Sequence, residues 1–243
     1  MITASKQGAR LVGLTTASNM RIISFGPSEM FGHGLADCFI PPNTPGNIPS
    51  KFAYPSLVAK HLECECINLS SPGCGALDVL LKILGFDFNA NDIVLVQWPS
   101  LGTATLISED NNLVNIQPWM AEDSLKILKH AVGADLIQYQ ANKSNLSINE
   151  QLIIAQNFYK THSDRHLSIT NCLYMDYAAL YLDSKHLKKV FGGAESWNFE
   201  YSPVTDHRVM KNHSDFLDVA LDGQHPGPLW HQQIANDILS IIQ

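Results

Sequence analysis

Three side chains from opposite ends of the chain could together perform nucleophilic catalysis. Ser28 follows the short apolar run 21–25, and Asp222 and His225 stand three positions apart in a loop that contains glycine and proline. A serine hydroxyl is a weak nucleophile at neutral pH, so it needs a base such as histidine, and a carboxylate can fix the tautomer of that histidine. We therefore predict that Ser28 is a nucleophile, that His225 is its base and that Asp222 orients His225.

The elements that must position these residues follow from the apolar pattern. Strands are predicted over residues 21–25, 66–69, 93–97 and 167–175, and helices over 54–62, 75–84, 121–139, 148–159 and 228–243. Strands that alternate with helices predict an α/β fold, with a parallel sheet covered by helices on both faces. In such sheets the ligand site lies beyond the carboxyl ends of the strands, so the chemistry belongs in the loops that follow them.

The remaining segments lack strong periodicity. Residues 38–52 contain four prolines and are expected to form an irregular surface loop, while residues 176–215 are expected to form short helices and loops over the site. Residues 1–19 are interpreted as a loosely held lead-in to a single domain over residues 20–243.

The order of these motifs resembles the SGNH (GDSL-type) hydrolases. In that family a Gly-x-Ser block follows the first strand, an oxyanion-hole glycine follows the second, and Asp-x-x-His-Pro precedes the last helix. The matching residues are Ser28 in Gly-Pro-Ser, Gly73 in Asn-Leu-Ser-Ser-Pro-Gly, and Asp222 with His225 in Asp-Gly-Gln-His-Pro. The resemblance implies a three-layer α/β/α fold with a flavodoxin-like parallel sheet, ester or acyl hydrolysis without a metal or organic cofactor, and an oxyanion hole that includes the N–H groups of Ser28 and Gly73.

Two positions depart from the family pattern. Pro27 stands where the family has an aspartate, and the asparagine expected after the third strand is missing, because the chain there reads Trp-Pro-Ser100. We predict Ser100, or a backbone N–H of its loop, as the replacement oxyanion donor; loss of one such donor typically slows a reaction by about 10²–10³-fold. Asn91-Asp92 precedes the strand, so it is expected at the opposite edge of the sheet.

The substrate is expected to be a small-molecule or glycan ester with a short acyl or acetyl group. Two alternatives remain open: a catalytically reduced protein that binds an acylated glycan or a protein partner, and an O-acyltransferase in which an acceptor hydroxyl replaces water. His33, five residues after Ser28, is interpreted as an ordinary surface or supporting histidine. The four tryptophans are assigned to packing rather than to a sugar platform, and they are Trp98, Trp119, Trp197 and Trp230.

Composition argues against several other classes of protein. The net charge of −7 and the pI near 5.7 disfavour nucleic acid as a partner, and no apolar run approaches the ~18 residues that cross a bilayer. Five cysteines, an odd number, indicate reduced thiols and a cytoplasmic location. A metal site is not expected from the Cys64-Glu-Cys66 pair, nor from the histidines at 162, 166, 207 and 213, because the spacings fit no familiar ligand motif.

Overall fold

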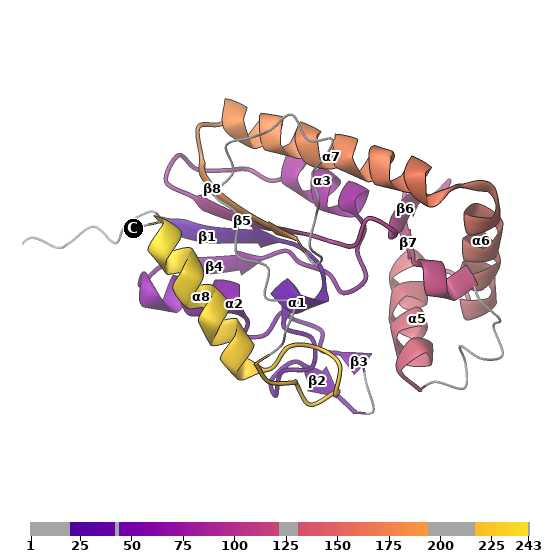
Figure 1. The fold of residues 1–243 in the computed structure, drawn as a ribbon, viewed down its shortest axis with the longest axis horizontal. Helices are drawn as coiled ribbons and strands as arrows, with labels where there is room; N and C mark the ends of the chain where they lie inside the picture. The colour runs from indigo at the N-terminus through magenta and orange to yellow at the C-terminus, as the bar shows by residue number, and fades with distance from the viewer. Residues whose placement is uncertain (1–19, 42–43, 122–130, 194–216, 243) are drawn as a thin grey trace, which may run out of the picture.

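A four-stranded parallel sheet runs through the centre of the molecule (Figure 1). The computed structural model describes residues 20–41, 44–121, 131–193 and 217–242. The sheet contains β1 (Arg21–Phe25), β4 (Glu65–Asn68), β5 (Ile93–Trp98) and β8 (Lys188–Gly193), in the order β4-β1-β5-β8. In chain order these are the second, first, third and fourth strands of the sheet, which is the flavodoxin-like arrangement. The predicted fold class is therefore confirmed.

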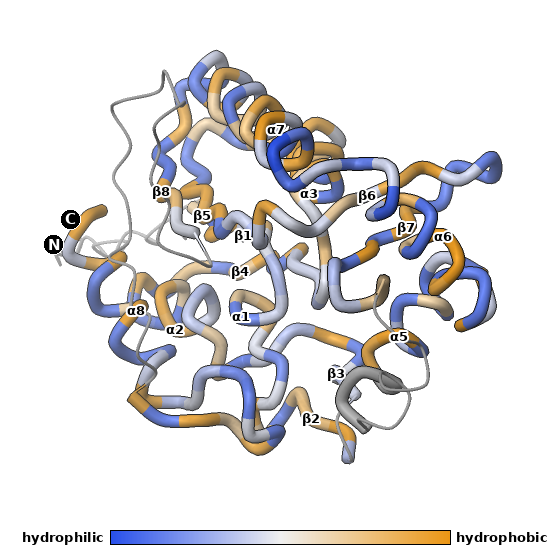
Figure 2. The backbone as a smooth tube through the Cα atoms, turned by 45° about the vertical axis from the view of Figure 1, so that its right-hand side comes forward, coloured by the Kyte–Doolittle hydropathy of each residue, from blue (hydrophilic) through white to orange (hydrophobic). Residues whose placement is uncertain are grey.

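Helices cover both faces of this sheet. On one face lie α2 (Tyr54–His61) and α8 (Pro228–Ile242), and on the other lie α3 (Ala76–Leu84) and α7 (Asp164–Ser184). Every residue of β5 is buried, because β5 is an inner strand with a helical layer on each side. Figure 2 shows hydrophobic and hydrophilic residues alternating along α7 and α8, as expected of helices with one face on the core and one in water.

A smaller layer lies beyond the carboxyl end of the sheet, on the right of Figure 1. It consists of the antiparallel hairpin β6 (Ala104–Ile107) and β7 (Leu113–Ile116), the 3₁₀ turn η1 (Pro118–Ala121), and the helices α5 (Ala131–Ser144) and α6 (Ile148–Thr161). These elements share their own buried cluster, which includes Ile116, Met120 and Ile137. The hairpin was not predicted from the sequence.

The strand predicted over residues 167–175 is wrong, because these residues lie within α7. Ser163 caps the helix by accepting the N–H of His166 at 3.2 Å, and Asp164 places a negative charge in the first turn, where the helix dipole favours it. The fourth parallel strand is instead β8, which lies in the segment 176–215 where short helices and loops were expected. Residues 194–216 lie outside the described residues.

The other helix predictions hold within a few residues. Helices predicted over residues 54–62, 75–84, 148–159 and 228–243 correspond to α2, α3, α6 and α8. The helix predicted over 121–139 is described from Ala131 and continues to Ser144, while 122–130 lie outside the described residues, as does the lead-in 1–19. The predicted loop 38–52 also contains the two-residue strands β2 (Phe39–Ile40) and β3 (Thr44–Pro45).

Two observations bear on the membrane span and the thiols considered in the sequence analysis. Within the described residues no helix is both long and apolar enough to cross a membrane. All five cysteines lie in described segments, and each is a free thiol.

Candidate active site

The loops at the carboxyl ends of β1 and β5 flank the point where the strand order of the sheet reverses. Gly26 begins the loop after β1, and a Cβ at this position would lie 2.9 Å from the carbonyl oxygen of Gln97 in β5. Only glycine therefore lets the two strand ends approach this closely. In doubly wound sheets this reversal point is where ligands bind.

Ser28 begins the short helix α1 (Ser28–Phe31), directly after this loop. Its hydroxyl donates a hydrogen bond to Oε2 of Glu29 at 3.3 Å. The first N–H groups of a helix have no partner within the helix, and the N–H of Ser28 donates no hydrogen bond within the described part of the chain. Ser28 thus combines a half-buried hydroxyl with an N–H that is available to a ligand.

Asp222 and His225 form a closed pair in the loop before α8. The Nδ1 atom of His225 is paired with Oδ2 of Asp222, and Oδ1 of Asp222 accepts the backbone N–H groups of Gln224 and His225, both at 3.0 Å. Gly223 lies between them at a φ of 72°, which turns the chain tightly enough for this contact. Burial disfavours the charged form of Asp222, but the hydrogen bonds from His225 and Gln224 outweigh it and hold the pKa of Asp222 well below its ordinary value.

This C-terminal loop packs against the residues that follow Ser28. The N–H of Leu221 donates to the carbonyl of Gly34 at 3.0 Å, and a Cβ on Gly34 would lie 2.8 Å from Cγ of Asp222. The ring of His33 lies against the ring of His225, with centroids 4.3 Å apart and planes inclined by 39°, and the N–H of His33 donates to the carbonyl of Ser28 at 3.0 Å. One residue therefore bridges the predicted nucleophile and the predicted base.

His33 was interpreted as an ordinary surface or supporting residue, and the structure shows that it is not at the surface. Only 2% of its area is exposed. No signal in the sequence could have placed it against His225, because the contact joins residues that are nearly two hundred positions apart.

The structure does not show the whole predicted triad in hydrogen-bonded contact. Among the described residues there is no hydrogen bond between Ser28 and His225, and the Ser28 hydroxyl is directed to Glu29 instead. A rotation about χ1 is the motion that changes the partner of a serine hydroxyl, and such rotations take picoseconds to nanoseconds at accessible positions.

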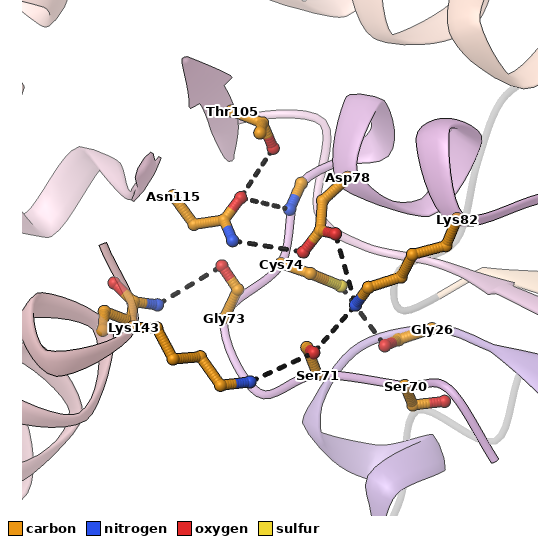
Figure 3. Close-up of polar contacts among 12 residues, drawn as sticks. Gly26, Ser70, Ser71, Gly73, Cys74, Asp78, Lys82, Thr105, Asn115 and Lys143 are labelled. Carbon is orange, nitrogen blue, oxygen red and sulfur yellow. Dashed lines mark hydrogen bonds and ion pairs between the residues drawn. The ribbon is translucent and has the colours of Figure 1, made fainter. Parts of the chain in front are cut away.

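The loop that contains Gly73 also lies beside Gly26 (Figure 3). The N–H of Ser71 donates to the carbonyl of Gly26 at 2.9 Å, and the thiol of Cys74 donates to the same carbonyl at 3.2 Å. Gly73 adopts a φ of 72°, and a Cβ there would collide with the amide of Gln140. Its N–H donates no hydrogen bond within the described residues. Both N–H groups expected to bind an oxyanion are therefore available, and the loops that carry them meet at Gly26.

Ser100 lies in the loop after β5, at the same edge of the sheet. Its hydroxyl oxygen accepts the N–H of Gly102 at 3.3 Å. Asn171 of α7 anchors this loop, because its amide donates to the carbonyls of Leu101 at 2.7 Å and Thr103 at 3.1 Å. Asp92 lies at the opposite edge, as expected, where it pairs with Arg21 at 2.6 Å.

Ligand atoms for a metal ion also come together in this region. His33, Asp222 and His225 each offer one atom, and these atoms lie within 4.8 Å of one another. His162 and His166 have ring centroids 5.2 Å apart, whereas positions 207 and 213 lie outside the described residues. Of the tryptophans, Trp98 and Trp230 are buried in the two main cores, and Trp197 is outside the described residues.

A second histidine near the site, His231 on α8, was not singled out in the sequence. It is fully buried, and its Nδ1 accepts the N–H of Tyr54 at 3.2 Å. The hydroxyl of Tyr54 in turn donates to Oε1 of Gln97 at 2.9 Å, so this chain of hydrogen bonds joins α8, α2 and β5. Burial lowers the pKa of His231 to about 3; the charge of Asp218 opposes this shift and that of His225 adds to it.

We expect the buried His231 to make the protein sensitive to acid. Because its folded pKa lies below the ordinary value of 6.5, the unfolded chain binds a proton that the native chain does not between pH 6.5 and 3. The free energy of unfolding should therefore fall with decreasing pH in this window, by up to about 1.4 kcal/mol per pH unit from this group. Urea unfolding at pH 7.0 and 4.5 should show a smaller difference for His231→Asn, which keeps an acceptor for Tyr54. An equal difference in both proteins would contradict this assignment.

Comparison with known proteins finds similar structures but no similar sequences. A scan of protein-family models gives no match, and a search of curated proteins also finds no match. Among solved structures, a carbohydrate esterase whose active site displays divergent catalytic and non-catalytic binding functions superposes with a TM-score of 0.51 and 13% identity, over 92% of this chain and 68% of the other.

Two further solved structures also match this chain. An acetyl xylan esterase from Butyrivibrio proteoclasticus gives a TM-score of 0.44 and 12% identity, over 92% of this chain and 63% of the other. A member of the lipolytic G-D-S-L family from Veillonella parvula gives a TM-score of 0.34 and 12% identity, over 91% of this chain and 97% of the other.

The superposition on the first structure, taken with the strand order, defines the class of fold. This chain has the α/β/α fold of an SGNH-type hydrolase. The fold positions the loops after β1 and β4 and the loop before α8 at one end of the molecule.

Proposed function

We propose that this protein is a serine esterase that removes a short acyl group, such as an acetyl group, from a small-molecule or glycan alcohol. The observation that supports the proposal most directly is the Asp222–His225 pair, docked through Gly34 and His33 onto the segment that begins with α1 at Ser28. A paired imidazole beside a serine at a helix start is what nucleophilic acyl transfer requires. The carbohydrate esterases among the structural neighbours fit the same chemistry.

In the proposed mechanism His225 takes the proton of Ser28 as its oxygen attacks the acyl carbonyl. Asp222 holds Nδ1 of His225 protonated, so that Nε2 is the atom that accepts the proton, and it stabilises the imidazolium that forms. The N–H groups of Ser28 and Gly73 donate to the developing oxyanion, and Ser100 is the third donor. His225 then returns the proton to the leaving alcohol, and a water molecule releases the acyl group from Ser28 by the reverse sequence.

A fluorophosphonate reagent tests the nucleophile without knowledge of the substrate. Such a reagent phosphonylates a serine only where a base activates it, so we expect stoichiometric labelling and a mass shift on the peptide that contains Ser28. Ser71→Ala and Ser100→Ala should still be labelled, whereas Ser28→Ala should not. Labelling of Ser71 or of another serine in the wild type would place the nucleophile elsewhere.

A non-catalytic binding protein with the same fold is the second candidate. It is favoured by the hydrogen bond of Ser28 to Glu29 and by the missing asparagine after β5. This candidate predicts no labelling at all, together with binding of an acylated glycan in the untreated protein. An acyltransferase would be labelled like an esterase, but it would transfer the acyl group to an added sugar in preference to water.

A further inference from the structure

A pocket of about 210 Å³ lies beside the Gly73 loop, where the β4–α3 loop, α3, β7 and α5 meet (Figure 3). The polar residues that line it include Ser71, Asp78, Lys82, Asn115 and Lys143. None of these residues takes part in the mechanism proposed above. Their arrangement has three features that together indicate a ligand.

The first feature is a pair of lysines that converge on one oxygen atom. Nζ of Lys82, on α3, donates to Oγ of Ser71 at 2.8 Å, and Nζ of Lys143, on α5, donates to the same atom at 3.3 Å. Figure 3 shows the two side chains reaching Ser71 from different helices. Two ammonium groups held around one hydroxyl repel each other, and an anion between them would offset that repulsion.

The second feature is an excess of positive charge. Asp78 is the one carboxylate that lines the pocket, and it is buried with 3% of its area exposed. It forms an ion pair with Lys82 at 3.2 Å and accepts the amide of Asn115 at 3.2 Å. Within the described residues Lys143 pairs with no carboxylate; its Nζ lies over the ring of Tyr139, 4.6 Å from the centroid. The pocket therefore carries one more positive than negative charge.

The third feature is the proton of the Ser71 hydroxyl. A serine hydroxyl has two acceptor lone pairs and one donor proton. Both lone pairs are used by the lysines, and no described residue accepts the proton. Within the described residues, the Ser71 hydroxyl proton thus has no acceptor, and the ammonium group of Lys143 has no carboxylate partner.

The pocket adjoins the predicted site of catalysis. Ser71 is two residues from Gly73, whose N–H is proposed to bind the oxyanion, and its own N–H donates to the carbonyl of Gly26, two residues before Ser28. Lys143 is exposed on α5, so the lysine pair is accessible to a molecule that enters from solvent.

From these observations we propose that the pocket formed by Ser71, Lys82 and Lys143 binds an anionic oxygen group, a carboxylate or a phosphate, on the ester substrate. The proposal rests on the proposed function and makes it more specific, because it selects acidic esters over neutral ones. A lysine ammonium group is a compact point charge that binds either a carboxylate or a phosphate. Either anionic group would therefore fit this site.

The binding of an anion is tested first, without reference to hydrolysis. At constant ionic strength, inorganic phosphate should raise the Tm of the wild-type protein by about 2–4 °C. The same rise is expected for Lys160→Met, a matched control in which an exposed lysine on α6 is lost. The rise should be absent in Lys143→Met and in Lys82→Met. A rise that persists in Lys143→Met would overturn the proposal, and this variant removes no partner of a buried charge.

The preference for acidic esters is tested with matched pairs of substrates. Hydrolysis of 3- and 4-acetoxybenzoate is compared with that of the neutral 3- and 4-acetoxybenzamides, and acetoxyphenyl phosphates replace the benzoates in a parallel series. We expect the wild type to favour at least one acidic series by about tenfold in kcat/KM, which corresponds to 1.4 kcal/mol. In Lys143→Met this ratio should approach one, while Lys160→Met should retain it, and added salt should reduce it.

The two possible failures are distinguishable. If the wild type hydrolyses none of these esters, the proposed function is contradicted and the phosphate experiment alone decides on the pocket. If the wild type hydrolyses them and the ratio of acidic to neutral ester is the same in Lys143→Met, the esterase assignment stands and the role of the pocket in substrate selection is refuted.

Discussion

Replacement of Ser28 by alanine should reduce kcat/KM for an activated acetate ester by about 10⁴-fold or more, because the proposed mechanism forms the acyl-enzyme on the Ser28 hydroxyl. The residual rate would come from the oxyanion donors alone. The N–H groups of residues 28 and 73 are main-chain groups, and this substitution leaves both in place. The measurement is hydrolysis of a chromogenic acetate ester at neutral pH, with wild type and variant prepared in parallel.

The same substitution should change stability little. The hydroxyl of Ser28 is half-buried and makes one hydrogen bond, to Glu29, so its loss should cost no more than about 0.5–1.5 kcal/mol. Ser100→Ala provides the comparison on the neighbouring loop: as an oxyanion donor it should lose activity by about 10²-fold, well short of the Ser28 variant. Undiminished turnover in Ser28→Ala would show that another residue is the nucleophile, and the labelling experiment would then identify it.

The parts of the fold that sequence alone predicted are those set by local pattern. β1 and β5 are short apolar runs that end at Gly-Pro and Trp-Pro, and α8 carries its apolar stripe from Pro228 onward. The prediction failed over residues 167–175, where the residue types favour a strand but the burial pattern is that of a helix. Residues 167–175 contain isoleucine and threonine, which favour strands, yet the buried positions of α7 follow a helical period over twenty-one residues. Within this nine-residue window, Leu167, Ile169, Leu173 and Met175 also fall at alternate positions, as in a strand, and β8 was missed as a consequence.

The contacts of the candidate site likewise fall into those that local sequence predicts and those that depend on tertiary packing. The Asp222–His225 contact was predictable because a glycine-containing turn joins the two residues across three positions. The contact of the His33 ring with the His225 ring was not predictable, because it depends on how the loop before α8 docks on Gly34. The convergence of Lys82 and Lys143 depends likewise on the packing of α3 and α5 around the Gly73 loop. Tertiary contacts of this kind leave no periodicity in the sequence.

Replacement of Asp222 by asparagine should lower kcat for the same ester by about 10³–10⁴-fold while leaving KM nearly unchanged. The side chain of Asp222 has no exposed area, and its carboxylate accepts hydrogen bonds from Nδ1 of His225 and from two backbone N–H groups. An amide fills the same space, but its NH₂ group cannot accept a proton from Nδ1. His225 would then adopt the tautomer that presents a protonated Nε2 to Ser28, so it could no longer act as the base.

Asp218→Asn is the matched control for this substitution, because Asp218 lies in the same loop and has a different task. Its two carboxylate oxygens accept the N–H groups of Leu229 and Trp230 at 3.0 Å, and they thereby cap the start of α8. The control should lose about 1 kcal/mol of stability and little activity. If the two variants lost activity equally, the loss would reflect a displaced loop; only a loss confined to Asp222→Asn, with an unchanged Tm, assigns to Asp222 the orientation of the catalytic imidazole.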